Sequence, residues 1–298
     1  AIVLATGPTV VTPLVRQIRL AAPLGDVLEA EGLVLEPIGA VLALLLLELV
    51  LGNLHGWREL VLGLLERLGG GVLIGASVGW LLSELLQRLK PDQSSGLPLQ
   101  LTLGMLFLMY GVSEWLLPES ALPASVAAGI VVGRRQTVHT ADLDGLIQEL
   151  AQLAITMLFP LLAADVSWAE LSPLGWGGVS CVLVLMLVVR PIAVGVATAG
   201  LPLNRPQKLF LGWLAPRGIV TASVASLFAI RLEQAGILGA GRLQGLVFLT
   251  ILMTVGLQGL TAQPLARALG LIEESCEATT PSGETTLQPG EVLPDPGQ

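Results

Sequence analysis

The chain has 298 residues, of which 53% are hydrophobic and only 13% are charged, and its mean hydropathy is +0.78. Soluble domains carry about 25% charged residues, so this composition excludes an ordinary soluble protein and indicates a polytopic, all-α membrane protein. The net charge of −8 arises mainly in residues 273–298, which contain six acids and no base. Nucleic acid is therefore not an expected partner.

Nine apolar segments follow one another along the chain. The first, residues 1–14, is too short to span a bilayer, which takes about 20 residues. Because the sequence begins inside this apolar run, we expect earlier helices to be missing at the N-terminus. The other segments are residues 27–52, 68–86, 97–117, 121–132, 147–164, 177–199, 208–230 and 243–265. We therefore expect one transmembrane domain over residues 1–272 and, after it, a disordered acidic tail over residues 273–298.

The basic residues of the loops predict the orientation of these segments. If the loops alternate between two sides of the membrane, one side receives nine Lys and Arg residues and the other receives four. The positive-inside rule assigns the richer side, and the tail, to the cytoplasm of a protein in the inner (plasma) membrane. The nine are Arg16, Arg19, Arg88, Lys90, Arg134, Arg135, Arg205, Lys208 and Arg267.

Residue types that carry enzymatic or metal chemistry are sparse. Cys181 lies in an apolar segment and Cys276 in the tail, so no disulfide or metal framework is indicated. His55 and His139 fall in loops, and the glycine run at residues 69–71 lacks the Lys and Ser/Thr of a phosphate-binding loop. We expect neither an enzyme nor a cofactor or metal site.

Two acids and two cations lie at membrane depth, where a charge costs several kcal/mol, roughly 2.5–3.5 on insertion scales. Glu36 lies inside the second segment, and Glu31 precedes it by five residues. Such acids bind an ion, carry a proton, pair with a buried cation, or reach toward the membrane surface. Arg217 needs a partner, and pairing it with one acid would leave the other free to titrate. Arg190 is expected to bond free backbone carbonyls.

Two segments carry matching helix breaks. Gly7 and Pro8 interrupt the first segment, and Pro216 and Gly218 interrupt the eighth, and β-branched residues follow each break. By the loop count the two segments run in opposite directions. Interrupted segments in corresponding halves point to the binding site of a secondary transporter, where half-helix ends face an ion.

These motifs carry a resemblance to a known family. The sequence resembles, over essentially residues 1–272, the bacterial sodium/proton antiporters of the monovalent cation:proton antiporter-1 family, NhaP-like branch. The family's Thr-Asp-Pro turn corresponds to Thr6-Gly7-Pro8, and its Glu-Ser-x-x-Asn-Asp-Pro-x-Gly motif to Glu31-Gly32-Leu33-Val34-Leu35-Glu36-Pro37-Ile38-Gly39. The arginine of its second discontinuous helix matches Arg217, and residues 257–266 are also similar to the family.

The resemblance implies an inverted-repeat antiporter fold with discontinuous helices, a core domain and a dimerisation domain. It implies that Glu36 is the carboxylate that a cation and a proton share, and that Thr6 helps to line the cation site. It further implies that Glu31 and Arg217 form a structural ion pair. Family members exchange one monovalent cation for one proton across the lipid bilayer, as homodimers.

The sequence departs from the family pattern at the site itself. Gly7, Gly32 and Leu35 stand where the family has Asp, Ser and Asn, and Glu36 replaces an Asp. The choice among Na⁺, Li⁺ and K⁺ is therefore open, and so is a second hypothesis, a truncated or degenerate paralogue that does not transport. A channel is a third hypothesis. Retention of Glu36 favours the antiporter.

Overall fold

The structure is a computed structural model that describes residues 7–21, 23–88, 96–135, 140–164, 171–237 and 239–272. Thr6 and the tail over residues 273–298 lie outside the described residues. Within them the chain is nearly all helical, and its only β-type pairing is an isolated bridge between Leu20 and Ile272. The expected all-α class is confirmed.

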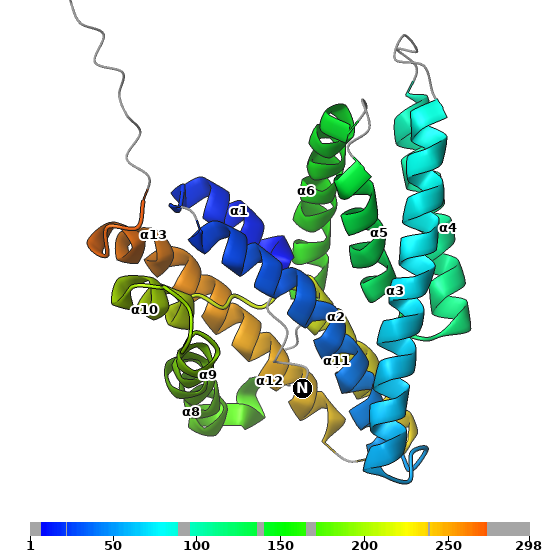
Figure 1. The fold of residues 1–298 in the computed structure, drawn as a ribbon. Coiled ribbons are helices and arrows are strands. Elements are labelled where there is room, and N and C mark those ends of the chain that lie inside the picture. The colour runs from blue at the N-terminus through cyan, green and yellow to red at the C-terminus, as the bar shows by residue number, and fades with distance from the viewer. Residues whose placement is uncertain are drawn as a thin grey trace, which may run out of the picture.

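The helices follow the apolar segments of the sequence (Figure 1). The first half contains α1 (Pro8–Ile18), α2 (Leu24–Val50), α3 (Trp57–Arg88), α4 (Leu97–Leu116), α5 (Ala121–Arg135) and α6 (Thr140–Ala164). The second half contains the 3₁₀ turn η2 (Ser172–Leu174), α8 (Gly175–Val184), the π-helix η3 (Leu185–Val189), α9 (Arg190–Ala197), α10 (Arg205–Trp213), α11 (Ile219–Gln234), α12 (Ala240–Met253), the π-helix η4 (Thr254–Gln258) and α13 (Gly259–Ala268).

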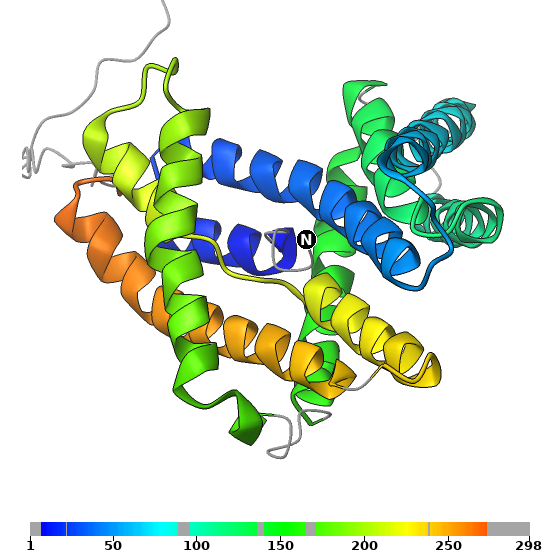
Figure 2. The ribbon, with the colours of Figure 1, turned by 90° about the horizontal axis from the view of Figure 1, so that it is seen from below.

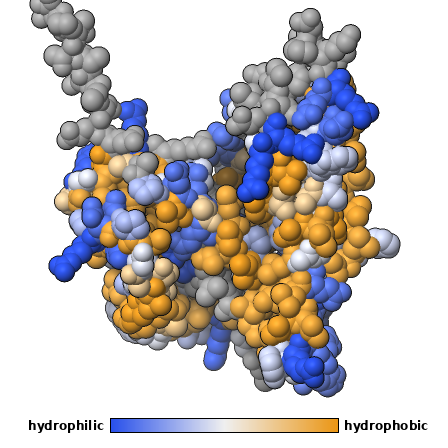
Figure 3. Space-filling model, viewed as in Figure 1, coloured by the Kyte–Doolittle hydropathy of each residue, from blue (hydrophilic) through white to orange (hydrophobic). Residues whose placement is uncertain are grey.

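Five helical stretches are long and apolar enough to cross a membrane. They are Leu24–Val50, Trp57–Arg88, Leu97–Leu116, Ser172–Ala197 and Gly241–Ala268. Hydrophobic side chains cover much of the molecular face in Figure 3. A large exposed apolar surface is unfavourable in water but is what a bilayer requires, so this is a multi-pass membrane protein.

The helices form two groups (Figures 1 and 2). One group contains α3, α4 and α5, which pack on one another. The other contains α1, α2 and the helices from α8 to α13, and α2 connects the two because it contacts α1, α11 and α3. Helix α3 begins at Trp57 rather than at residue 68 as the apolar pattern predicted, because its charged first turns continue the helix. Arg67, in these turns, forms an ion pair with Glu48 of α2 at 3.0 Å.

One end of the second group is closed by a link between distant parts of the chain. The backbone N–H of Ala21, just after α1, donates to the carbonyl of Leu271 at 2.9 Å, beside the Leu20–Ile272 bridge. Leu20 and Leu271 of this link belong to a core cluster that also includes Leu24, Phe210 and Ala262. The end of α1 and the end of α13 are therefore held at the same face of the molecule.

The contact between α3 and α5 depends on the absence of side chains. Gly71, Gly75 and Gly79 lie on one face of α3, as their spacing of four residues predicted. A Cβ built on Gly75 would lie 2.0 Å from the carbonyl oxygen of Ala124, and one on Gly79 would lie 2.8 Å from the Cα of Ala128. Backbone atoms cannot move aside as a flexible side chain can.

We expect Gly75→Ala to destabilise the protein by about 1–3 kcal/mol, because the added methyl group overpacks the α3–α5 contact. Thermal unfolding in detergent measures the effect. Gly104→Ala in α4 is the matched control, since a Cβ there meets no atom within 4 Å and alanine is the better helix former. Equal melting temperatures for Gly75→Ala and wild type would contradict the close packing.

Candidate ion-binding site

The site is built where the two broken segments cross. Helix α10 ends at Trp213, residues 214–218 are extended, and α11 begins at Ile219. In the first segment Gly7 is also extended, with φ −82° and ψ 112°, and Pro8 opens α1, where its missing N–H is not needed. The N–H of Gly7 donates to the carbonyl of Pro216 at 3.2 Å.

The crossing leaves no room for a side chain on Gly7. A Cβ at this position would lie 2.3 Å from the Cα of Gly218 and 2.5 Å from its nitrogen. Glycine is therefore required by the close approach of two backbones and not by an unusual φ angle. The four helix-break residues predicted from the sequence, Gly7, Pro8, Pro216 and Gly218, all lie at or beside this crossing.

Several backbone polar groups in and beside the extended stretch have partners on neighbouring helices. The buried amide of Gln258 accepts a hydrogen bond from the N–H of Ala215 at 3.0 Å and donates to the carbonyl of Trp213 at 2.7 Å. The hydroxyl of Thr254 accepts from the N–H of Arg217 at 3.4 Å. Thr254 and Gln258 are the first and last residues of the π-helix η4, a type of distortion that is frequent at functional sites.

A buried ion pair supports the same stretch from the other side. Both terminal nitrogens of Arg190 bond Glu31 of α2: Nη1 bonds Oε1, and Nη2 lies 2.8 Å from Oε2. The two side chains are 11% and 22% exposed. Nη2 also donates to the carbonyl of Leu214 at 3.4 Å, so Arg190 bonds a free backbone carbonyl as predicted.

The partner seen here, Arg190, was not the one that the resemblance implied. Helix α9 begins at Arg190 and packs against α10, which brings this guanidinium between α2 and the break. A pairing of Glu31 with Arg217 as well stays a prediction. Arg217 lies within electrostatic range of both Glu31 and Arg190.

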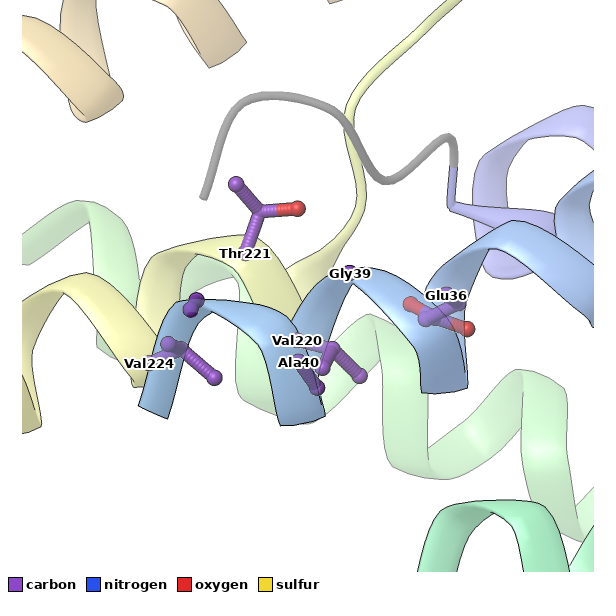
Figure 4. A pocket seen from close by; sticks show the side chains of 7 residues that line it. Glu36, Gly39, Ala40, Val220, Thr221 and Val224 are labelled. Atoms are coloured by element: carbon purple, nitrogen blue, oxygen red, sulfur yellow. The ribbon is translucent and has the colours of Figure 1, made fainter. Parts of the chain in front are cut away.

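Glu36 lines a small pocket between α2 and α11. The pocket encloses about 200 Å³, including space that opens outward, and its lining residues are Glu36, Gly39, Ala40, Ala43, Val220, Thr221 and Val224. Figure 4 shows Glu36 projecting from α2 and Thr221 from the first turn of α11, with Gly39 of α2 between their labels in this view. Among the residues that line the pocket, these two alone have polar side chains.

Both polar side chains of the pocket are buried without a partner. Glu36 is 7% exposed and Thr221 is 3% exposed. Within the described part of the chain, neither Oε1 of Glu36 nor Oγ1 of Thr221 has a hydrogen-bond partner. A buried polar atom without a partner is costly, and one explanation for its retention is an ion or proton bound there in one state of the protein.

The pocket has a single carboxylate among its lining side chains. The described residues contain no group of three His, Cys, Asp or Glu side chains that could hold a metal ion. One carboxylate balances a single positive charge, which either a proton or a monovalent cation supplies. The first turn of α11 carries the positive end of its helix dipole, which stabilises a nearby charged carboxylate.

Sequence reasoning found most but not all of these positions. Thr6, which precedes Gly7 in the sequence, lies outside the described residues. Gly32 and Leu35, which replace polar residues of the family pattern, do not line the pocket. Gln258 and Thr221 were not predicted as site residues, although a buried glutamine in an apolar segment and a threonine just after a helix break were available signals.

Comparison with known proteins agrees with this geometry. Residues 1–268 match the family model described as sodium/hydrogen exchanger, transmembrane. The chain belongs to the sodium/hydrogen exchanger family. This is a family of secondary transporters and not of enzymes, as expected.

Curated relatives are identical to the chain at about a quarter of the aligned positions. A probable Na⁺/H⁺ antiporter 2 of Methanocaldococcus jannaschii is 25% identical over 90% of this chain and 69% of the relative. The Na⁺/H⁺ antiporter NhaH of Halobacillus dabanensis is 26% identical, over 91% and 68%. The K⁺/H⁺ antiporter NhaP2 of Shewanella sp. strain MR-4 is 24% identical, over 90% and 46%.

A solved structure shares the fold. The sodium proton antiporter MjNhaP1 from M. jannaschii at pH 8 superposes with a TM-score of 0.76 and 23% identity, over 91% of this chain and 69% of that chain. The antiporter fold with discontinuous helices that the sequence predicted is therefore confirmed.

We expect Arg190→Ala to destabilise the protein by about 1–3 kcal/mol, because it leaves the partly buried Glu31 carboxylate without its cation. Glu31→Gln in the same chain should restore part of this loss, as measured by thermal unfolding in detergent. Arg88→Ala, which breaks an exposed pair with Glu84, is the control and should cost less than about 1 kcal/mol.

The double variant decides which partner Glu31 has. If Glu31→Gln fails to improve Arg190→Ala but improves Arg217→Ala, the pairing implied by the resemblance holds and the one described above is wrong.

Proposed function

We propose that the protein exchanges a monovalent cation, Na⁺ or K⁺, for a proton across the membrane, and that the two ions compete for Glu36. The single observation that carries this proposal is the buried carboxylate of Glu36 near the crossing of two broken segments, whose Oε1 has no hydrogen-bond partner among the described residues. Membership of the sodium/hydrogen exchanger family supports it, and the named activities of the relatives, Na⁺/H⁺ and K⁺/H⁺ antiport, leave the two cations as the candidates.

The mechanism follows from having one carboxylate in a small pocket. Glu36 cannot hold a proton and a cation together, so binding of one releases the other. An empty, charged Glu36 in the apolar interior is costly, which disfavours reorientation of the site unless an ion is bound. Exchange of one positive charge for another moves no net charge, so its rate should depend little on the membrane potential.

The residues that bond the extended stretch hold its backbone in place while a proton and a cation replace each other at Glu36. Gln258 and the Arg190–Glu31 pair bond the backbone on one side of Pro216, and none of the three lines the pocket. We therefore assign them a positioning role and Glu36 the ion-binding role. Thr6 remains a proposed site residue on the strength of the resemblance and its place next to Gly7.

A second candidate, a paralogue without transport activity, is favoured by the composition of the site. Gly7, Gly32 and Leu35 replace three side chains with oxygen atoms in the family pattern. Gly7 has a structural explanation, since the crossing excludes any side chain there, whereas Leu35 places an apolar side chain where the family has an amide. Cation binding by the purified protein discriminates between the two candidates.

We expect Glu36→Gln to abolish Na⁺- or K⁺-driven proton movement in proteoliposomes, because the amide keeps the shape of the side chain but cannot carry the charge. The variant should fold, since no hydrogen bond to Oε1 is lost. Glu36→Asp keeps a carboxylate but draws it back toward the α2 backbone by one methylene group. We expect this variant to retain exchange with an altered cation preference.

The matched control for these variants is Glu84→Gln, which changes an exposed acid of α3 and should leave exchange unchanged. Robust exchange by Glu36→Gln would remove Glu36 from the mechanism. Wild-type protein that neither binds nor exchanges either cation would favour the paralogue without transport activity.

We further propose that the basic loops and the chain end after α13 face the cytoplasm and that the protein forms homodimers. The orientation is supported by the nine-to-four distribution of Lys and Arg, and the link between Ala21 and Leu271 is consistent with it, since it holds two predicted cytoplasmic ends together. The dimer rests on the resemblance to the family, and the exposed apolar faces of the helices are compatible with it.

In a background in which Cys181 and Cys276 are replaced by alanine, a cysteine at Gly96 should resist a membrane-impermeant thiol reagent added to intact cells. A cysteine at Asn53, in the opposite loop, should react. Both positions are exposed turns at the ends of helices, so accessibility differs only through the side of the membrane. The reverse labelling pattern would invert the proposed topology.

A further inference from the structure

The hydroxyl of Thr221 is distinguished from the other buried threonines of the described chain by what it bonds. Thr198, Thr250 and Thr254 each donate to a carbonyl three or four residues earlier, at 2.7, 2.7 and 3.2 Å. The hydroxyl of Thr221 is as deeply buried and has no partner among the described residues. Burial alone therefore does not explain it.

The helix break explains why this hydroxyl is left over. Thr221 is the third residue of α11, so the residue four positions earlier, Arg217, belongs to the extended stretch and not to a preceding helical turn. The usual bond from a threonine to its own helix is therefore not formed here. The broken segment thus supplies, at the pocket, an oxygen that an unbroken helix would have occupied.

The pocket needs such an oxygen. A small cation that leaves water exchanges its hydration shell for several oxygen ligands, and Glu36 supplies at most two. The remaining lining residues, Gly39, Ala40, Ala43, Val220 and Val224, have no side-chain oxygen. Thr221 is the one other lining residue that can provide one.

We propose that Thr221 is a cation ligand, whose hydroxyl oxygen coordinates the monovalent ion bound at Glu36 and contributes to the choice between Na⁺ and K⁺. This inference rests on the proposed function and extends it to a residue on the opposite helix. Because α2 supplies the carboxylate and α11 the hydroxyl, the cation joins the two helices when it binds, whereas a proton on Glu36 does not require this second contact.

Thr221→Val tests the proposal, because valine keeps the branched shape and removes the oxygen, and Thr221→Ala removes it without the second methyl group. Binding of Na⁺ and of K⁺ is measured separately on the purified protein in detergent at alkaline pH, from the cation-dependent rise of the melting temperature. We expect both variants to bind the preferred cation about tenfold more weakly or worse, the usual scale for loss of one contact to a charged group.

Two further variants control for packing. Thr221→Ser restores the oxygen and should stay within about threefold of the wild-type affinity. Thr250→Val removes an equally buried hydroxyl that already bonds its own helix, outside the pocket, and should lower stability without changing cation affinity. A ratio of Na⁺ to K⁺ affinities that changes in Thr221→Val but not in Thr250→Val would show that the hydroxyl acts on the ion and not only on the fold.

The outcomes separate this inference from the proposed function. If Glu36→Gln loses cation binding while Thr221→Val and Thr221→Ala bind as wild type does, Thr221 is not a ligand and the role of Glu36 stands. If Glu36→Gln binds and exchanges normally, the proposed function fails, whatever the threonine variants do. If Thr221→Ser loses affinity as strongly as Thr221→Val, the effect is one of packing and the inference is overturned.

Discussion

The close approach of two backbones at Gly7 and Gly218 is the constraint on which the rest of the structure depends. Two segments can cross at this distance only where neither has a side chain, and there both leave the helical conformation. Each break frees backbone groups that must be satisfied in the apolar interior. Side chains of the surrounding helices bond several of these groups.

The polar side chains near the crossing divide into two sets with different roles. Gln258, Thr254 and Arg190 complete the hydrogen bonds of the extended stretch and thereby fix its path. Glu36 and Thr221 face the pocket and are left incomplete. Rigidity and ion exchange make opposite demands on polar groups, and the fold assigns them to different side chains near the same short stretch.

Features with local causes could be predicted from the sequence, and those with distant causes could not. The break near Pro216 follows from Pro and Gly within an apolar segment, and burial of Glu36 follows from its depth in α2. The partner of Glu31 depends on how α9 lies against α10, which no local pattern specifies. Likewise, the free hydroxyl of Thr221 is a property of its surroundings, since a threonine in an apolar helix ordinarily bonds its own backbone.

The π-helices decide in which direction around the helix axis two polar side chains point. Arg190 follows η3, and Gln258 is the last residue of η4. Each successive residue in an α-helix turns by about 100°, so the wider turn of η3 decides which way Arg190 points when α9 begins. Loss of one residue from η3 would restore a regular helix and swing Arg190 away from Glu31 while changing no side chain. The same holds for η4 and Gln258. In these two short stretches the number of residues therefore matters as well as their chemistry, because it decides where Arg190 and Gln258 point.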